Sequence, residues 1–239
     1  MDGGGVGDPG STGRLLGAPI RNLHLEITSR CTLACPRCQR NANPEELEVN
    51  DVPLPVLRST LTRANFPDIE FVNFAGNYGD AIYHRHFHAV IRHVKSEGLK
   101  IRLETNGSYR NRAWWDETAS ILERRDRVAL SIDGLEDTNQ VYRVKSRWRD
   151  IMGAAEALRG HVTLIWKFIV FRHNQHQIEE ATARARELGF DEFRLIRSHR
   201  YDGRWRGPDG IDPMKPDDEW VSDRQRVAAR VLEIIRERG

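Results

Sequence analysis

The sequence predicts an α/β fold in which a parallel sheet of six strands closes part of a barrel. Short runs rich in β-branched and aromatic residues alternate with longer segments of helical periodicity from about residue 22 to residue 198. This alternation is typical of βα units with right-handed crossovers, which build a parallel sheet. We therefore expect a partial, TIM-like (β/α)6 barrel. Periodicity alone leaves a flat, doubly wound sheet open as the alternative.

The candidate strands and the helices between them account for most of the chain. Strands are expected at Asn22–Thr28, Ile69–Ala75, Lys100–Thr105, Arg127–Asp133, Val162–Phe171 and Glu192–Arg197. Helices are expected at Pro55–Ala64, His84–Ser96, Ala113–Arg124, Arg147–Arg159 and Gln177–Leu188. Turn residues support these boundaries, because Gly98 and Gly189 follow helices and Asn106-Gly107 and Asp133-Gly134 follow strands.

The two ends of the chain differ from this pattern. Residues 1–18 are rich in glycine and lack the apolar run of a secretory signal, so we expect a disordered segment there. Residues 19–239 are expected to form one domain, in which a loop rich in Gly and Pro and a final helix at Asp217–Arg238 follow the sixth strand. No apolar stretch approaches the roughly 20 residues that cross a bilayer, so we expect a cytoplasmic protein without a membrane partner.

The charged residues argue against a nucleic-acid partner. Most of the 37 basic residues are arginines, and such a composition can mark a nucleic-acid interface. However, the 35 acidic residues are interleaved with them, and the formal net charge is only +2. A continuous stripe for phosphates is therefore not expected.

All three cysteines lie in one loop directly after the first strand, at Cys31, Cys35 and Cys38. A clustered, odd number of cysteines in a cytosolic chain favours a metal site over disulfides. Three thiolates at the spacing C-x3-C-x2-C can hold three irons of a cubane and leave the fourth open to a small molecule. The alternative is a zinc site completed by a histidine such as His24 or His84, although zinc ligands usually come in two separated pairs.

The cysteine loop and its position resemble those of the radical SAM superfamily, in which a C-x3-C-x-φ-C motif follows strand one of a partial TIM barrel. The resemblance implies a [4Fe–4S] cluster on Cys31, Cys35 and Cys38, with S-adenosylmethionine (SAM) bound at the open iron. It also implies a low-potential electron donor of the flavodoxin or ferredoxin type, whose electron splits SAM into methionine and a 5′-deoxyadenosyl radical. The φ position, commonly aromatic and close to the adenine, is Arg37 here, and a guanidinium can also stack on adenine.

After the second strand, the family has a Gly-Gly-Glu-Pro-like segment that binds the amino group of SAM. The matching segment of this chain is a degenerate version, in which an aspartate replaces the glutamate and an alanine replaces the proline. A carboxylate and backbone carbonyls at a glycine turn can still accept hydrogen bonds from an ammonium group. The resemblance therefore implies SAM contacts from Asn77, Tyr78, Gly79 and Asp80.

The ends of later strands also resemble the family pattern. Asn106 belongs to a Thr-Asn-Gly strand ending that is common in the superfamily. In peptide-modifying members, a serine at the end of strand four and an arginine just downstream hold the SAM carboxylate, and Ser131 and Arg143 match those positions. Leu195, in the sixth strand, is expected to add to the apolar surface beside the adenine.

Side-chain alternation along the strands gives a separate argument for a cavity. Successive side chains of a strand point to opposite faces, and one face of the predicted sheet is largely polar. Its residues are Glu26, Thr28, Asn73, Glu104, Asn106, Ser131, Asp133, Lys167 and Arg197. A packed barrel fills its interior with branched apolar residues, so this polar face predicts a wet cavity that holds a ligand. Substrate contacts are expected from Glu104, Lys167 and Arg197, and from Tyr201 in the loop after the sixth strand.

The leading hypothesis is a radical SAM enzyme that abstracts hydrogen from a small metabolite or a ribosomal peptide. Since no cysteine follows Cys38, this chain cannot hold a second cysteine-ligated cluster or donate a hydrogen atom from a thiol. Three alternatives remain open at this point. They are an enzyme similar to the 7-carboxy-7-deazaguanine synthases, a zinc-binding nucleic-acid module, and a barrel that binds a cluster for sensing without catalysis.

Overall fold

The computed structural model describes residues 14, 15, 18–42, 47–197, 212 and 214–217. At its centre is a six-stranded sheet whose neighbouring strands are parallel and follow one another in chain order. The strands are β3 (Asn22–Leu25), β4 (Phe71–Phe74), β5 (Lys100–Thr105), β6 (Arg127–Ser131), β7 (Thr163–Val170) and β8 (Glu192–Arg197). A doubly wound sheet reverses its strand order at a switch point. The continuous order confirms the partial (β/α)6 barrel.

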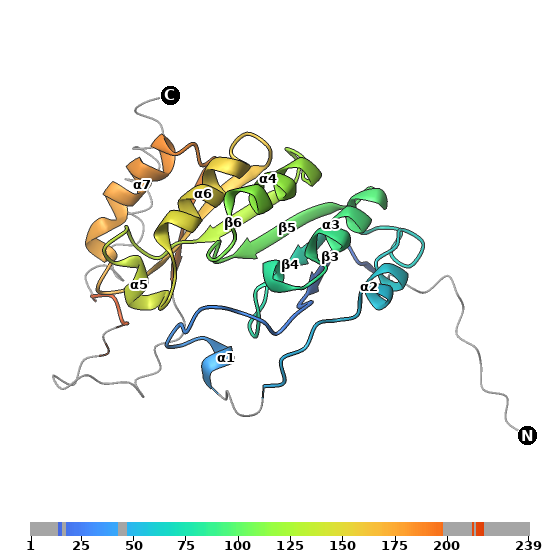
Figure 1. Ribbon diagram of the computed structural model, residues 1–239, viewed down its shortest axis with the longest axis horizontal. Helices are drawn as coiled ribbons and strands as arrows, with labels where there is room; N and C mark the ends of the chain where they lie inside the picture. Colours follow the sequence, from blue (N-terminus) through green and yellow to red (C-terminus); the bar gives the residue numbers. More distant parts are fainter. Residues whose placement is uncertain (1–13, 16–17, 43–46, 198–211, 213, 218–239) are drawn as a thin grey trace, which may run out of the picture.

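Helices link successive strands and lie along one side of the sheet (Figure 1). The predicted helices are present as α2 (Leu54–Thr60), α3 (Phe87–Ser96), α4 (Arg112–Ile121), α6 (Trp148–Leu158) and α7 (Ile178–Glu187). Short elements that the periodicity did not predict are β1 (Arg14–Leu15), β2 (Ala18–Pro19), α1 (Gln39–Ala42), α5 (Asn139–Tyr142) and 3₁₀ turns at Ala81–Tyr83 and Gln175–Gln177. Each of these is shorter than the window in which a periodic pattern can be recognised.

Local hydrogen bonds explain where several helices begin and end. The Asn111 side chain accepts from the Trp114 amide and caps α4. Helix α3 begins three residues later than predicted, because Asp80 caps a 3₁₀ turn just before it. It ends before Gly98, whose φ of 70° lies in the left-handed region that favours glycine.

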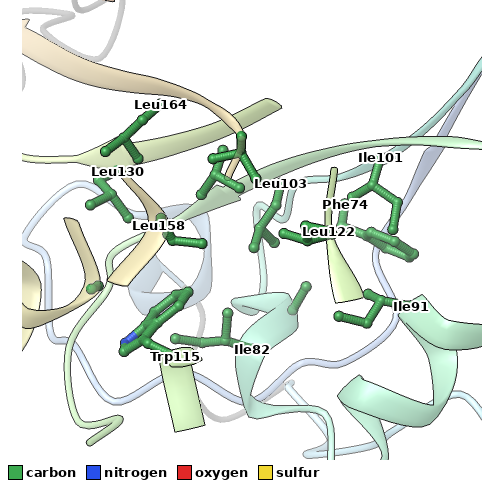
Figure 2. Close-up of a cluster of buried hydrophobic side chains, with 14 of the residues drawn as sticks. Phe74, Ile82, Ile91, Ile101, Leu103, Trp115, Leu122, Leu130, Leu158 and Leu164 are labelled. Carbon is green, nitrogen blue, oxygen red and sulfur yellow. The ribbon is translucent and has the colours of Figure 1, made fainter. Parts of the chain in front are cut away.

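The main core lies between the sheet and the helices (Figure 2). The strands contribute side chains from one face only, and the helices contribute their apolar stripes. Side chains at the centre include Phe74, Ile82, Ile91, Ile101, Leu103, Trp115, Leu122, Leu130, Leu158 and Leu164. Burying a large apolar side chain stabilises a fold by about 1.5–3 kcal/mol, so this layer holds the sheet and leaves its other face available for a site.

Several predictions concern residues at the two ends of the chain. Most of residues 1–18, most of the loop after β8 and nearly all of the expected final helix lie outside the described residues, so the division into domains stays a prediction. Among the described residues, no helix has the length and apolar character needed to cross a membrane.

Candidate functional site

A cavity of about 380 Å³ opens at the carboxyl ends of the strands, on the face of the sheet opposite the main core. Ligands of barrels built from βα units bind at this end. The cavity brings together most of the site residues predicted from the sequence. They are Cys31, Cys35, Cys38, Asn77, Gly79, Asp80, Glu104, Asn106, Ser131, Lys167 and Arg143.

The cysteine loop leaves β3 and is held in place by hydrogen bonds to its backbone. The Ala34 amide donates to the Val144 carbonyl at 3.1 Å, and Asn41 Nδ2 donates to the Cys35 carbonyl at 2.8 Å. Arg40 donates to the Ser29 carbonyl and, at 3.0 Å, to the Tyr78 carbonyl. The loop is therefore tied to the turn after β4 and to the segment after α5.

The cysteine thiols lie in surroundings that disfavour free thiolates. Burial raises the pKa of Cys31 to about 12, and the nearby Asp80 adds to the shift. Burial also raises the pKa of Cys35, although Arg143 acts in the opposite direction. Thiolates buried in this way need a positive partner, and iron ions supply the charge that releases their protons.

The donor set fits a cubane cluster better than a single metal ion. Within the described ranges, no three His, Cys, Asp or Glu side chains are grouped closely enough to hold one ion. A cubane has no such requirement, because each of three thiolates ligates a different iron. All three cysteines line the same cavity, so Cys31, Cys35 and Cys38 would supply the three thiolates for such a cluster.

The histidines considered for zinc are already engaged. His84 Nε2 donates to the Val52 carbonyl at 2.9 Å, and His84 Nδ1 accepts from the His86 amide at 3.1 Å. His24 lines the cavity, and its Nε2 donates to the Ala75 carbonyl at 2.8 Å. These bonds favour histidines that fix the local backbone over histidines that complete a zinc site.

The turn after β4 packs directly on the segment that follows β3. A Cβ at Gly79 would lie 2.0 Å from the Thr28 carbonyl oxygen, and one at Gly76 would lie 2.3 Å from the Gly79 carbonyl oxygen. Only glycine allows these close approaches. Glu26 accepts from Asn77 Nδ2 at 3.2 Å and from the Tyr78 amide at 3.0 Å, which shapes the turn beside the cysteines.

Asp80 is buried and its carboxylate is engaged by the protein itself. Its Oδ2 accepts from Thr105 Oγ1 at 2.9 Å and from the amide and Nδ2 of Asn106 at 2.7 and 2.6 Å. Burial raises the pKa of Asp80 to about 6, although these hydrogen bonds favour the charged form. Asn106 Nδ2 also lies 3.7 Å from Cys31 Sγ. Asp80 therefore positions Asn106 beside the cysteine loop.

Ser131 and Arg143 meet at the cavity although they come from different elements. Ser131 ends β6, and Arg143 follows α5. Arg143 Nε donates to Asp133 Oδ2 at 2.6 Å, and Asp133 Oδ1 accepts from the Ile169 amide at 2.6 Å. Burial opposes the charged form of Arg143, but the negative charges of Asp133, Cys35 and Tyr142 together, with Asp133 the largest, raise the pKa of Arg143. The cavity wall thus offers a permanent cation and a hydroxyl, and both groups suit a carboxylate ligand.

Glu104 and Lys167 form an ion pair that reaches from β5 to β7. Lys167 Nζ lies 2.5 Å from Glu104 Oε2, and both side chains are partly exposed. In the sheet, Glu104 is in register with Ala129 of β6, and Lys167 with Ser131. The small Ala129 side chain between them leaves room for the pair to bridge β6.

The remaining predicted residues lie elsewhere. Arg37 does not line the cavity, and its Nη2 pairs with Asp212 Oδ1 at 2.6 Å. Tyr78 is exposed and contributes backbone contacts. Leu195 packs against the main core, and the next residue, Ile196, lines the cavity, which corrects the predicted register by one position.

Arg197 and Tyr201 are the two remaining residues that were predicted to contact the substrate. Arg197 is in register with Val170, and its side chain is not among those described. Tyr201 lies outside the described residues.

Other lining residues were not predicted as ligands. His24 shares the lumen face with Glu26, so the same alternation argument could have found it. Tyr142 and Ile169 also line the cavity. Ile169 shares the face of β7 with Lys167, so strand alternation could have found it too, whereas nothing in the local sequence marked Tyr142. Tyr142 packs on Phe171 with ring centroids 4.3 Å apart, in a buried cluster that also contains Cys35 and Leu33.

Comparison with known proteins agrees with this geometry. The family model described as the radical SAM superfamily matches residues 25–185. A PqqA peptide cyclase of Xanthomonas campestris is 26% identical over 190 residues, which cover 77% of this chain and 48% of that protein. A tungsten-containing aldehyde ferredoxin oxidoreductase cofactor-modifying protein of Pyrococcus furiosus is 33% identical over 91 residues, which cover 37% of this chain and 24% of that protein. This chain thus matches about half or less of the length of these curated relatives.

Solved structures share the fold at low sequence identity. Streptococcus suis SuiB bound to S-adenosylmethionine has a TM-score of 0.66 at 16% identity, over 91% of this chain and 48% of that chain. A methylornithine synthase (PylB) has a TM-score of 0.60 at 15% identity, over 86% of this chain and 61% of that chain. The matched family segment includes the cysteine loop and runs from β3 into α7, and on that match the chain belongs to the radical SAM superfamily.

Proposed function

We propose that this radical SAM enzyme holds a [4Fe–4S] cluster on Cys31, Cys35 and Cys38 and binds SAM in the adjoining cavity. One observation carries the proposal: the three cysteines and the polar ends of β5 and β6 open onto the same cavity. When bound, the cluster would supply the electron that splits SAM into methionine and a 5′-deoxyadenosyl radical. The residues of the chain bind, orient and shield the reactants.

Each end of the methionine part of SAM has a matching group in the cavity. Arg143 and Ser131 both line the cavity and would hold the carboxylate, because a guanidinium and a hydroxyl both donate hydrogen bonds. The backbone carbonyls of the Gly76–Asp80 turn would accept from the ammonium group. Asn106, positioned by Asp80, lies between this turn and Cys31.

The substrate would bind in the lumen against the Glu104–Lys167 pair. A carboxylate and an ammonium at 2.5 Å offer one acceptor and one donor to a ligand that separates them. This chemistry suits a compact zwitterion or a polar residue of a peptide. The names of the relatives include a peptide cyclase and a cofactor-modifying protein, which supports a peptide or a small molecule as the substrate class.

The test is anaerobic reconstitution with iron and sulfide, followed by addition of dithionite and SAM and measurement of 5′-deoxyadenosine. Wild-type protein is expected to form it, and Cys35→Ala is expected to form none and to lose bound iron. Matched controls are Ser131→Ala, which keeps the cluster ligands and should retain iron, and zinc-loaded protein, which should be inactive. Zinc in the native protein, with no iron and no 5′-deoxyadenosine after reconstitution, would contradict the proposal.

A further inference from the structure

The side-chain amide of Asn106 lies between a buried carboxylate and a cysteine. Asn106 Nδ2 is 2.6 Å from Asp80 Oδ2 and 3.7 Å from Cys31 Sγ. A carboxamide nitrogen carries two hydrogens, so it can donate one to each acceptor. A thiolate is a stronger acceptor than a thiol, because it is charged. Asn106 is therefore placed to donate to Cys31 once that cysteine has lost its proton.

The hydrogen bonds of Asn106 fix which end of its carboxamide faces Cys31. Asn106 Oδ1 accepts from the Ser108 amide at 2.9 Å, so the oxygen is turned toward that backbone. The reverse orientation would place this oxygen beside the Asp80 carboxylate and would leave the Ser108 amide facing an NH2 group. Asn106 is buried, and unpaired polar groups are costly in such a place. The NH2 group therefore faces Asp80 and Cys31.

The cysteine loop and the segment after β5 are tied together beside this contact. Thr32, the residue after Cys31, donates from Oγ1 to the Tyr83 hydroxyl at 2.9 Å. That hydroxyl donates to the Ser108 carbonyl at 2.6 Å. Ser108 is the same residue whose amide holds Asn106. The contact between Asn106 and Cys31 is thus fixed from both sides, although the two residues are 75 positions apart.

Asp80 uses both of its carboxylate oxygens to hold its neighbours. Oδ2 accepts from Thr105 Oγ1 at 2.9 Å and from the amide and Nδ2 of Asn106 at 2.7 and 2.6 Å. Oδ1 accepts from the Ile82 amide at 3.3 Å. A buried carboxylate needs such donors, and Asn106 supplies more of them than either other residue. Asp80 is therefore a positioning residue, which acts on the cysteine loop through Asn106.

We infer that Asn106 donates a hydrogen bond to the ligated Cys31 thiolate and raises the reduction potential of the cluster, and that Asp80 positions Asn106 for this role. The inference rests on the proposed function, because it requires a cluster on the cysteine loop. Hydrogen bonds to the sulfurs are among the factors that set the potential of an iron–sulfur cluster. Because reduction adds negative charge, a donor stabilises the reduced cluster more than the oxidised one.

The experiment is an anaerobic redox titration of the reconstituted full chain without SAM, in which electron paramagnetic resonance follows the reduced cluster. Asn106→Leu replaces the carboxamide by an apolar group, and Asn106→Ala is a second variant that introduces no bulk. Thr105→Val is the matched control, because it removes a donor from the same Asp80 oxygen and leaves both residues of the Asn106–Cys31 contact unchanged. The iron content of each protein shows whether the cluster is bound.

Both Asn106 variants are expected to lower the midpoint potential of the cluster. Loss of a hydrogen bond to a charged sulfur should decrease the ratio of reduced to oxidised cluster about tenfold at a fixed potential, which corresponds to about 59 mV for a one-electron couple. Thr105→Val should titrate at the wild-type potential.

A wild-type potential in both Asn106 variants, or an equal shift in Thr105→Val, would overturn the inference and leave the proposed function standing. Loss of bound iron from both Asn106 variants would also overturn it, since the residue would then have a structural role. A wild-type protein that binds no [4Fe–4S] cluster would refute the proposed function, and the inference with it.

Discussion

Arg143 donates from Nε to Asp133 Oδ2 at 2.6 Å, and this ion pair fixes a guanidinium at the wall of the cavity. The Asp133 side chain is completely buried, and 15% of the Arg143 side chain is exposed. The two residues are only ten positions apart, yet the pair joins the end of β6 to the segment that follows α5.

Breaking this pair from one side should destabilise the protein. Arg143→Met leaves the Asp133 carboxylate buried without its cation, and we expect a loss of about 3 kcal/mol in the free energy of unfolding. Asp133→Asn/Arg143→Met should recover part of that loss because it removes both charges. Urea denaturation of the cluster-free protein measures both. A double variant as unstable as the single one would show that the pair is not the cause.

The Gly79 and Gly153 positions predict opposite effects of the same substitution. A Cβ at Gly79 would lie 2.0 Å from the Thr28 carbonyl oxygen, whereas one at Gly153, inside α6, meets nothing within 4 Å. Gly79→Ala should therefore displace the turn and reduce both iron binding and stability. Gly153→Ala should stabilise the protein by about 0.5–1 kcal/mol, because alanine loses less backbone entropy in a helix. Thermal melting and iron analysis of the two variants measure these effects. Equal melting temperatures of Gly79→Ala and Gly153→Ala would contradict the prediction.

The Glu104–Lys167 pair should contribute to substrate binding and contribute little to the stability of the fold. Partly exposed ion pairs contribute about 0–1 kcal/mol, so Glu104→Gln/Lys167→Met is expected to melt close to the wild type. In the absence of substrate, the double variant should still form 5′-deoxyadenosine at close to the wild-type rate, since neither residue is assigned to SAM. A large loss of this uncoupled cleavage would place the pair in the SAM site instead.

His173 predicts a loss of stability in mild acid. Burial lowers the pKa of His173 from 6.5 to about 4, and its ring stacks on Phe171 with centroids 5.4 Å apart. Both ring nitrogens are buried without a hydrogen-bond partner. As the pH falls from 6.5 toward 4, the unfolded chain binds a proton at His173 before the folded protein does, so stability decreases over that range.

His173→Phe keeps the stacked ring and removes the titration. The free energy of unfolding of this variant should fall less than that of the wild type between pH 7 and pH 5. Urea denaturation at the two pH values measures the difference. Parallel losses in both proteins would assign the acid sensitivity to other groups.

The amino-acid sequence by itself determined the alternation of strands and helices along the chain and the identity of the cysteine loop, whereas the order of the strands in the sheet came from the structure. Strand and helix periods are local properties, so the six barrel strands could be predicted before any contact was known. The spacing of Cys31, Cys35 and Cys38 is also local, and so is the serine that ends β6. Because parallel strands end at one edge, Glu104, Ser131 and Lys167 could be predicted to share a cavity.

Only the tertiary structure decided the details that depend on packing between distant segments. Leu195 was expected at the cavity, but Leu195 packs on the main core and Ile196 lines the cavity. A shift of one residue along a strand moves each side chain to the opposite face of the sheet. Arg37 is paired with Asp212, which lies 175 positions away, and no local pattern links the two. Asp80 accepts a hydrogen bond from Asn106 and fixes its position, because the oxygens of a buried carboxylate need hydrogen-bond donors from the protein. The segment after α5 contacts the cysteine loop for the same kind of reason, since the bond from Ala34 to Val144 forms only when the barrel is folded.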